Sequence, residues 1–160
     1  MIRRIEVVRA AWGAALLVAP RQVLGRVHHL RVDRASVRVA RVLGARQLGQ
    51  AVLSGVDPSP EVLAMGVWVD GVHAATAVGL AVVDRHRARA GLTDAAIAGA
   101  YAVLGYRDLV TARPTPPSHQ RRRDELARAV LGLVPGGGPL LSRCAAARTR
   151  AAGSPTRPRR

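Results

Sequence analysis

The chain has 160 residues, a length typical of one domain or of one domain with an appendage, and this excludes a multi-domain enzyme. All 25 basic residues are arginine and only 10 residues are acidic, so the formal net charge is +15 and any partner attracted through bulk electrostatics is polyanionic: nucleic acid or an anionic membrane surface. The lone Cys144 excludes an intramolecular disulfide and a cysteine-based zinc site.

The first predicted helix runs from about Ile5 to Ala19 and ends where Pro20 begins a new segment. Its uncharged part, residues 10–19, is far shorter than the roughly 20 residues that a membrane-spanning helix needs. A secretory signal peptide has a similar outline, but Glu6 interrupts its basic end. A basic connector follows over residues 21–35.

The second predicted helix begins near Asp33 or Ser36, because either side chain can accept a hydrogen bond from the amides of a first helical turn. It ends near Ser54, and beyond Gln50 it is apolar. Its first half carries three arginines, Arg38, Arg41 and Arg46.

The third predicted helix carries the strongest signal in the chain. Ser59 is placed as its N-cap, and Pro60 fits the first helical position. The stretch from Val62 to Val83 holds only two ionisable residues, Asp70 and His73. At about 1.5 Å per residue it reaches roughly 33 Å, which is enough to cross a bilayer.

A fourth helix, capped by Thr93, is predicted from Asp94 to about Tyr106 or Val110. It is alanine-rich and moderately apolar. The sequence therefore predicts an all-α fold in which residues 1–112 form a small antiparallel bundle of about four helices embedded in a membrane.

Residues 113–160 are expected to form a separate basic tail that begins with a proline-rich linker. Within it, residues 120–134 fit a basic amphipathic helix, which Gly136 to Gly138 would end. The remainder, including Cys144, is predicted to be mobile or disordered.

The distribution of arginines favours a hairpin over four equal spans. Four spans would place both basic connectors, residues 21–34 and 85–89, on the side opposite the basic termini, which the positive-inside rule opposes. We therefore expect only the second and third helices to cross, with the first and fourth lying shallow. Both termini and both connectors would then face the cytoplasm, and the turn around Asp57 and Glu61 would face outward.

Arg46 and Asp70 are predicted to form an intramembrane polar pair. Each lies about ten residues from the intervening turn, so in an antiparallel hairpin both sit at a similar depth. A charge alone at the bilayer centre costs about 2.5–3.5 kcal/mol on insertion scales, which favours a neutralised pair. Gln50 and His73 lie one turn away on the same helix faces, so a proton relay or ligand site is the alternative interpretation.

Other motifs are assigned structural roles. Two glycines, Gly44 and Gly49, have the spacing of a phosphate-binding loop, but Gln50 stands where its lysine would be, so close helix packing is predicted instead, together with Ala75 and Gly79. Asp70 and His73 supply only half of a metal site, so no metal or cofactor is expected. We find no setting for a catalytic nucleophile.

The segments Ala40-Arg-Val-Leu-Gly-Ala-Arg-Gln-Leu-Gly-Gln50 and Gly66-Val-Trp-Val-Asp-Gly-Val-His-Ala-Ala-Thr76 resemble those of small, uncharacterised multi-helix membrane proteins of high-GC actinobacteria. The resemblance covers roughly residues 5–110. It implies a membrane location and a helical fold and adds no reaction. The motif residues that it carries over are Gly44, Arg46, Gly49, Asp70 and His73.

The sequence thus predicts a non-enzymatic integral protein of the cytoplasmic membrane, acting as a scaffold or as a partner-binding component. Its arginines would contact anionic lipid headgroups, and it would bind a protein partner or a second copy of itself. One alternative is a soluble or peripheral helical protein that binds nucleic acid without sequence preference, although no aromatic residues are interleaved with its arginines for base stacking. A second is a transporter or proton-relay component that uses Asp70 and His73.

Overall fold

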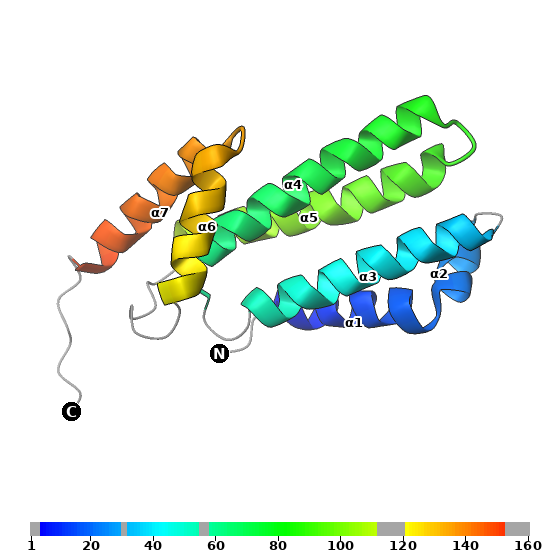
Figure 1. The fold of residues 1–160 in the computed structure, drawn as a ribbon, viewed down its shortest axis with the longest axis horizontal. Coiled ribbons are helices and arrows are strands. Elements are labelled where there is room, and N and C mark those ends of the chain that lie inside the picture. Colours follow the sequence, from blue (N-terminus) through cyan, green and yellow to red (C-terminus); the bar gives the residue numbers. More distant parts are fainter. Residues whose placement is uncertain (1–3, 30–31, 55–57, 112–120, 153–160) are drawn as a thin grey trace.

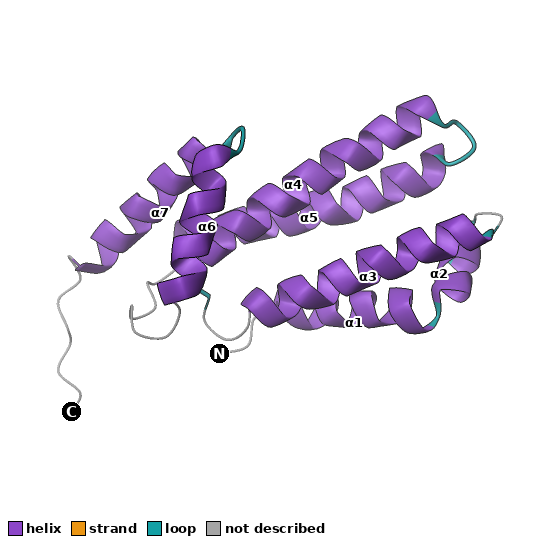
Figure 2. Ribbon diagram, in the orientation of Figure 1, coloured by secondary structure: helices purple, strands orange, loops and turns teal. Residues whose placement is uncertain are grey.

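The computed structural model describes residues 4–29, 32–54, 58–111 and 121–152, and α-helices joined by short loops make up this part of the chain (Figures 1 and 2). Seven helices are formed within it: α1 (Arg4–Val18), α2 (Pro20–Arg26), α3 (Arg34–Ser54), α4 (Pro60–Val83), α5 (Ala88–Thr111), α6 (Arg121–Leu133) and α7 (Gly137–Ala152).

The helices form three hairpins. In the first, α1 packs along α3, with the short α2 turning the chain between them; in the second, α4 packs along α5; in the third, which we call the tail hairpin, α6 packs on α7 (Figure 1). The first and second hairpins meet over a smaller surface than the one that joins the helices within each. The tail hairpin packs on α4 and α5.

Local signals in the sequence explain where two of the long helices begin. The Ser59 hydroxyl accepts a hydrogen bond from the Val62 amide at 3.3 Å, with Pro60 in the first turn of α4. At the start of α3, the Ser36 amide donates to the Asp33 carboxylate at 2.6 Å and the Asp33 amide donates to the Ser36 hydroxyl at 3.1 Å, which is the reciprocal pattern of a capping box.

The all-α prediction is confirmed, but the helices differ from the expected four. The basic connector contains α2, and α5 begins at Ala88 instead of at an N-cap on Thr93. Thr93 lies inside α5, where its hydroxyl donates to the Arg89 carbonyl at 2.9 Å, so it bonds backward along the helix and caps nothing. The predicted amphipathic helix over 120–134 corresponds to α6.

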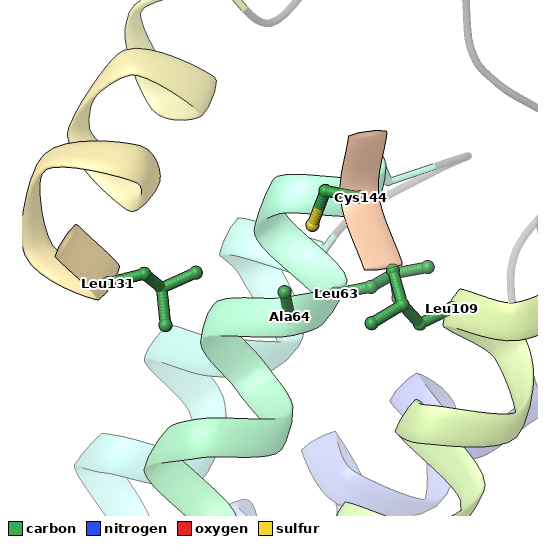
Figure 3. Packing of buried hydrophobic residues seen from close by; sticks show 5 residues of the cluster. All are labelled: Leu63, Ala64, Leu109, Leu131 and Cys144. Atoms are coloured by element: carbon green, nitrogen blue, oxygen red, sulfur yellow. The ribbon is translucent and has the colours of Figure 1, made fainter. Parts of the chain in front are cut away.

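The largest difference lies in the tail, where α7 occupies a segment predicted to be disordered. Cys144 is buried in α7, and with Leu131 of α6 it packs against Leu63 and Ala64 of α4 and Leu109 of α5 (Figure 3). The chain reverses at Gly136, whose φ of +79° favours glycine.

The second core cluster lies in the first hairpin. It joins Leu16 of α1, Val23 and Leu24 of α2, and Ala40 of α3, with Trp12 packed against it. The cores are small and rich in alanine, as the low aromatic content predicts. The helices of the first two hairpins therefore keep much of their apolar surface exposed.

The structure does not match the prediction that the tail and the turn before α4 face opposite sides of a membrane. The tail hairpin lies at the end of α4 that carries Glu61, and the start of α1 lies near the end of α3 at that same side of the molecule (Figure 1). A tail docked beside Glu61 cannot face the cytoplasm while the turn before α4 faces outward. Moreover, α5 lies along the length of α4, so the two helices would extend equally far into any membrane that α4 crossed. Asp57 is outside the described residues.

Candidate functional site

Asp70 lies at the centre of a buried polar cluster between the first and second hairpins. It is 1% exposed and accepts two hydrogen bonds from Arg9, one to each carboxylate oxygen, at 3.1 and 2.8 Å. Arg46 donates to Oδ1 at 3.0 Å and Gln50 to the same oxygen at 3.4 Å. We call these four residues the Asp70 cluster.

Arg9 connects the Asp70 cluster to neighbouring side chains on several helices. Its Nη1 also donates to Gln47 at 3.2 Å and to Gln50 at 3.0 Å, and Glu6 lies 3.5 Å from its Nε. The guanidinium carbon lies 4.3 Å from the centre of the Tyr101 ring, which gives a cation–π contact to α5. One side chain of α1 thereby contacts α3, α4 and α5.

Arg46 occupies the edge of the cluster. Its side chain is 22% exposed, and besides Asp70 it donates to the Val69 carbonyl oxygen at 3.1 Å. The fork of Arg9, in contrast, engages Asp70 through two parallel bonds, which is the stronger geometry for an arginine and a carboxylate. Arg9 is therefore the main counter-ion of Asp70 and Arg46 the secondary one.

The structure brings Arg46, Gln50 and Asp70 together but places His73 elsewhere. His73 Nε2 lies 2.8 Å from Asp94 of α5. Sequence reasoning missed Arg9, because it treated the residue as a flank of a short apolar stretch. One feature of the sequence could have identified it: Arg9 lies about two helical turns before Leu16, so both side chains point to the same face of the first helix, and Leu16 packs in the core.

The residues predicted to allow close helix packing differ in whether they lie at a contact between helices. A Cβ on Gly44 would lie 2.7 Å from the carbonyl oxygen of Gly13, so these two glycines let α1 and α3 approach closely. Gly49 and Gly79 have open space around them, and Ala75 is exposed. In the second hairpin the close contact is at Gly91, where a Cβ would lie 2.8 Å from the Ala77 carbonyl oxygen.

A second buried polar cluster attaches the tail hairpin to the start of α4. Arg148 of α7 donates from Nε and Nη2 to the two carboxylate oxygens of Glu61, both at 2.7 Å, and from Nη2 to Asp124 of α6 at 3.1 Å. The Ser59 hydroxyl donates to the other oxygen of Asp124. Glu61 and Asp124 are 2% and 4% exposed, so this Arg148 cluster lies inside the interface.

The thiol of Cys144 lies beside this cluster and donates to the Pro60 carbonyl oxygen at 3.3 Å. Burial, reinforced by the negative charge of Glu61, raises the pKa of Cys144 to about 12. A thiol that keeps its proton at neutral pH is a poor nucleophile and a poor metal ligand.

The chemistry of these clusters is that of structural ion pairs. Both oxygens of Asp70 are occupied by guanidinium donors, and arginine does not give up its proton in proteins. Across the part of the chain that the structure covers with side chains, no three histidine, cysteine, aspartate or glutamate residues are arranged to hold a metal ion.

Comparison with protein-family models, with curated proteins and with solved structures finds no match for this chain. The resemblance of residues 5–110 to actinobacterial membrane proteins therefore stays a prediction.

Proposed function

We propose that the protein is a non-enzymatic component of the cytoplasmic membrane, a scaffold or partner-binding subunit whose two helical hairpins are joined by the Asp70 cluster. Its arginines contact anionic headgroups, its partner is another protein or a second copy of the chain, and it uses no cofactor. The observation that carries this proposal is the apolar surface of α4.

By length and composition, α4 is the one single helix among the described residues that could cross a membrane. Helices α1 and α2 would meet the same criteria only as one broken span, and they are bent by 103° at Ala19. A long apolar helix also occurs in the core of soluble proteins, but there it is mostly buried. Only 17% of the most apolar stretch of α4 is buried, which favours contact with lipid.

The exposed apolar surface extends beyond α4. Large aliphatic side chains are exposed on all four long helices of the two hairpins, including Val8 on α1, Val42 on α3, Val82 on α4 and Val103 on α5, each more than half exposed. Apolar side chains exposed together mark contact with a membrane or with another protein. Their occurrence on all four helices supports a covering of lipid or of another protein.

The Asp70 cluster fits a lipid environment because its charges balance internally. Hydrocarbon offers no water to solvate an ion, so an intramembrane carboxylate requires direct neutralising partners. Asp70 has two guanidiniums, and Glu6 lies beside the first of them. Two positive and two negative charges are thereby brought together between the hairpins.

For sidedness, we place the termini and the tail hairpin on the cytoplasmic side. Eleven of the 25 arginines follow residue 112, whereas the two connectors over residues 21–34 and 85–89 contain seven between them. Lysine and arginine are enriched on the cytoplasmic side of membrane proteins, so the end with more arginine faces inward.

The decisive experiment introduces a charge in the middle of α4. Val72 is 41% exposed, so Val72→Arg costs little in water but about 2.5–3.5 kcal/mol at a bilayer centre. We expect the wild-type protein to stay in membranes washed with alkaline carbonate and the variant to be lost from them. Leu126→Arg, on the exposed face of α6, is the matched control and should behave as wild type.

If carbonate removed the wild-type protein from the membranes, and removed the Val72→Arg variant to the same extent, membrane insertion would be contradicted. The peripheral nucleic-acid-binding alternative would then be favoured. The transporter or proton-relay alternative has no support from the geometry. Its two central residues have different partners, Asp70 with Arg9 and Arg46, and His73 with Asp94.

A further inference from the structure

A cavity of about 330 Å³ lies between the first and second hairpins, partly open to the surface. Its volume is at the lower end of the range for small-molecule sites, roughly 300–1,000 Å³. The wall is mostly aliphatic, with Leu16, Leu24, Leu43 and Leu80 among its residues. It is separate from the Asp70 cluster, none of whose four residues lines it.

The charged groups that line the cavity already have partners. His73 is paired with Asp94 at 2.8 Å. Arg87 lies 3.5 Å from Asp33 and 3.7 Å from Asp84. The cavity therefore presents no unbalanced charge, and an ionised ligand group would lose its hydration without a free counter-ion.

One polar side chain that lines the cavity has a ring nitrogen without a hydrogen-bond partner among the described residues. His28 is 6% exposed, and its Nδ1 has no hydrogen-bond partner within the described part of the chain. Burial lowers the pKa of His28, against a smaller opposing effect of Asp94, so its ring is neutral at pH 7. Trp12 lies beside it, with ring centres 6.3 Å apart, and its buried Nε1 is also without a partner among the described residues.

The orphaned Nδ1 of His28, which lines the cavity, indicates the missing group. Buried polar groups are normally hydrogen-bonded, and an indole N–H can only donate, whereas a neutral imidazole donates from one nitrogen and accepts at the other. A hydroxyl both donates and accepts, so it matches the His28 Nδ1 in either tautomer of the neutral ring. A carboxylate or an ammonium provides only one of the two functions.

We propose that this cavity binds an amphiphile with a single aliphatic chain and an uncharged hydroxyl head, the chain lying along the leucines and the hydroxyl beside His28. The inference goes beyond the proposed function, since the cavity is formed between the hairpins whether or not α4 crosses a bilayer; only the choice of lipid nanodiscs for the test rests on that function.

The two tryptophans make the test specific. Trp12 is next to His28, whereas Trp68 donates from Nε1 to the Pro135 carbonyl oxygen at 2.9 Å, beside the tail hairpin. The full-length Trp68→Phe protein therefore reports on the cavity, and the Trp12→Phe protein reports on non-specific partition. Both are titrated in lipid nanodiscs at pH 8 with 1-decanol, decanoate and decyltrimethylammonium.

We expect 1-decanol to give a saturable change in Trp12 emission, with no saturable change for Trp68. Decanoate and decyltrimethylammonium should bind at least about tenfold more weakly, because each would bring an uncompensated charge into the cavity. Equal responses to the three head groups, or a preference for either ion, would overturn the assignment of a neutral head.

Two further variants, each made in the Trp68→Phe background, separate the cavity from the surrounding bilayer. Thr76 lines the cavity and is exposed, so Thr76→Phe should fill the space and abolish the saturable response. Thr111→Phe is the matched control, because that threonine also bonds back to its own helix but lies outside the cavity. His28→Leu should weaken decanol binding about 3- to 10-fold. Unchanged binding to Thr76→Phe would overturn the proposal.

Discussion

Asp70 is the residue on which the contact between the two main hairpins depends most. Its carboxylate is 1% exposed and accepts hydrogen bonds from side chains of α1 and α3. A buried ion pair contributes less to stability than its distances suggest, because both groups lose their hydration. Removing one partner is costly nonetheless, because the other is left charged and buried.

We expect Asp70→Asn to lower the free energy of unfolding by about 3–5 kcal/mol, because Arg9 would be left without its main counter-ion. Adding Arg9→Gln should recover part of the loss. Adding Arg46→Gln should recover less, since Arg46 is 22% exposed and more easily solvated. Thermal unfolding of the single and double variants in one detergent measures these couplings.

Arg41→Gln is the control, because Arg41 is exposed on the same helix as Arg46, and its effect should stay within about 0.5 kcal/mol. Additive effects of Arg9→Gln and Asp70→Asn, within about 0.3–0.5 kcal/mol, would show that the two side chains are not coupled.

At the scale of helices, the first hairpin is held at one point where backbones nearly touch. Gly13 and Gly44 face each other, and each Cβ that substitution would add meets the carbonyl oxygen of the other glycine, at 2.8 and 2.7 Å. Backbone atoms cannot move aside as a flexible side chain can. The separation of α1 and α3, and with it the reach of Arg9, is therefore set by these two residues.

We expect Gly44→Ala to destabilise the protein by about 1–3 kcal/mol, because α1 and α3 must move apart to admit the methyl group. Gly49→Ala on the same helix has open space and should be neutral or stabilising by up to about 1 kcal/mol, since alanine favours the helix over glycine. Unfolding curves of the two variants compare the same chemical change at two positions. Equal effects would contradict the close contact.

At the scale of the whole molecule, the tail hairpin closes over the ends of the other helices. Arg148 joins it to α4, Arg123 donates to the Leu53 carbonyl oxygen at the end of α3, and Arg150 donates to the Val110 carbonyl oxygen at the end of α5. The arginines of α6 and α7 therefore have structural partners as well as a general attraction to anions.

Cys144 reports whether this hairpin is docked. With its pKa raised from 9.0 to about 12, the folded protein favours the protonated thiol, so this contribution to stability is complete below about pH 9 and is lost as the pH rises towards 12. At pH 7.5 we expect iodoacetamide to label Cys144 about a hundredfold more slowly in the native protein than after unfolding.

Arg148→Met should increase the native labelling rate, because Glu61 and Asp124 would be left buried without their shared cation and the tail hairpin would detach. Arg143→Met, at an exposed position on the same helix, should leave the rate unchanged. Rapid labelling of the wild-type protein would contradict the docked arrangement.

Much of the helical pattern could be predicted from capping and breaking residues. Ser59 with Pro60 defines the start of α4, and Asp33 with Ser36 that of α3. Thr93 misled the prediction because a threonine inside a helix can bond to its own preceding turn. The alanine-rich segment after Gly138 was interpreted as disordered, although Cys144 and Ala147 recur at a helical spacing and both are buried.

The candidate site could be predicted only in part, for a geometric reason. Distance from a turn places Arg46 and Asp70 at similar levels because they flank that turn in sequence. Arg9 comes from a helix whose register depends on the contact between Gly13 and Gly44, and no local pattern fixes that register. The partner of His73 was likewise hidden, because the start of α5 was placed too late.

The order in which the chain is synthesised determines when the Asp70 cluster can form. Arg9 and Arg46 are synthesised before Asp70, so until α4 emerges the nascent first hairpin carries two guanidiniums with a single neighbouring acid, Glu6. The Asp70 cluster can therefore form only once α4 has emerged, and the contact between the two hairpins is completed after the first hairpin has been made.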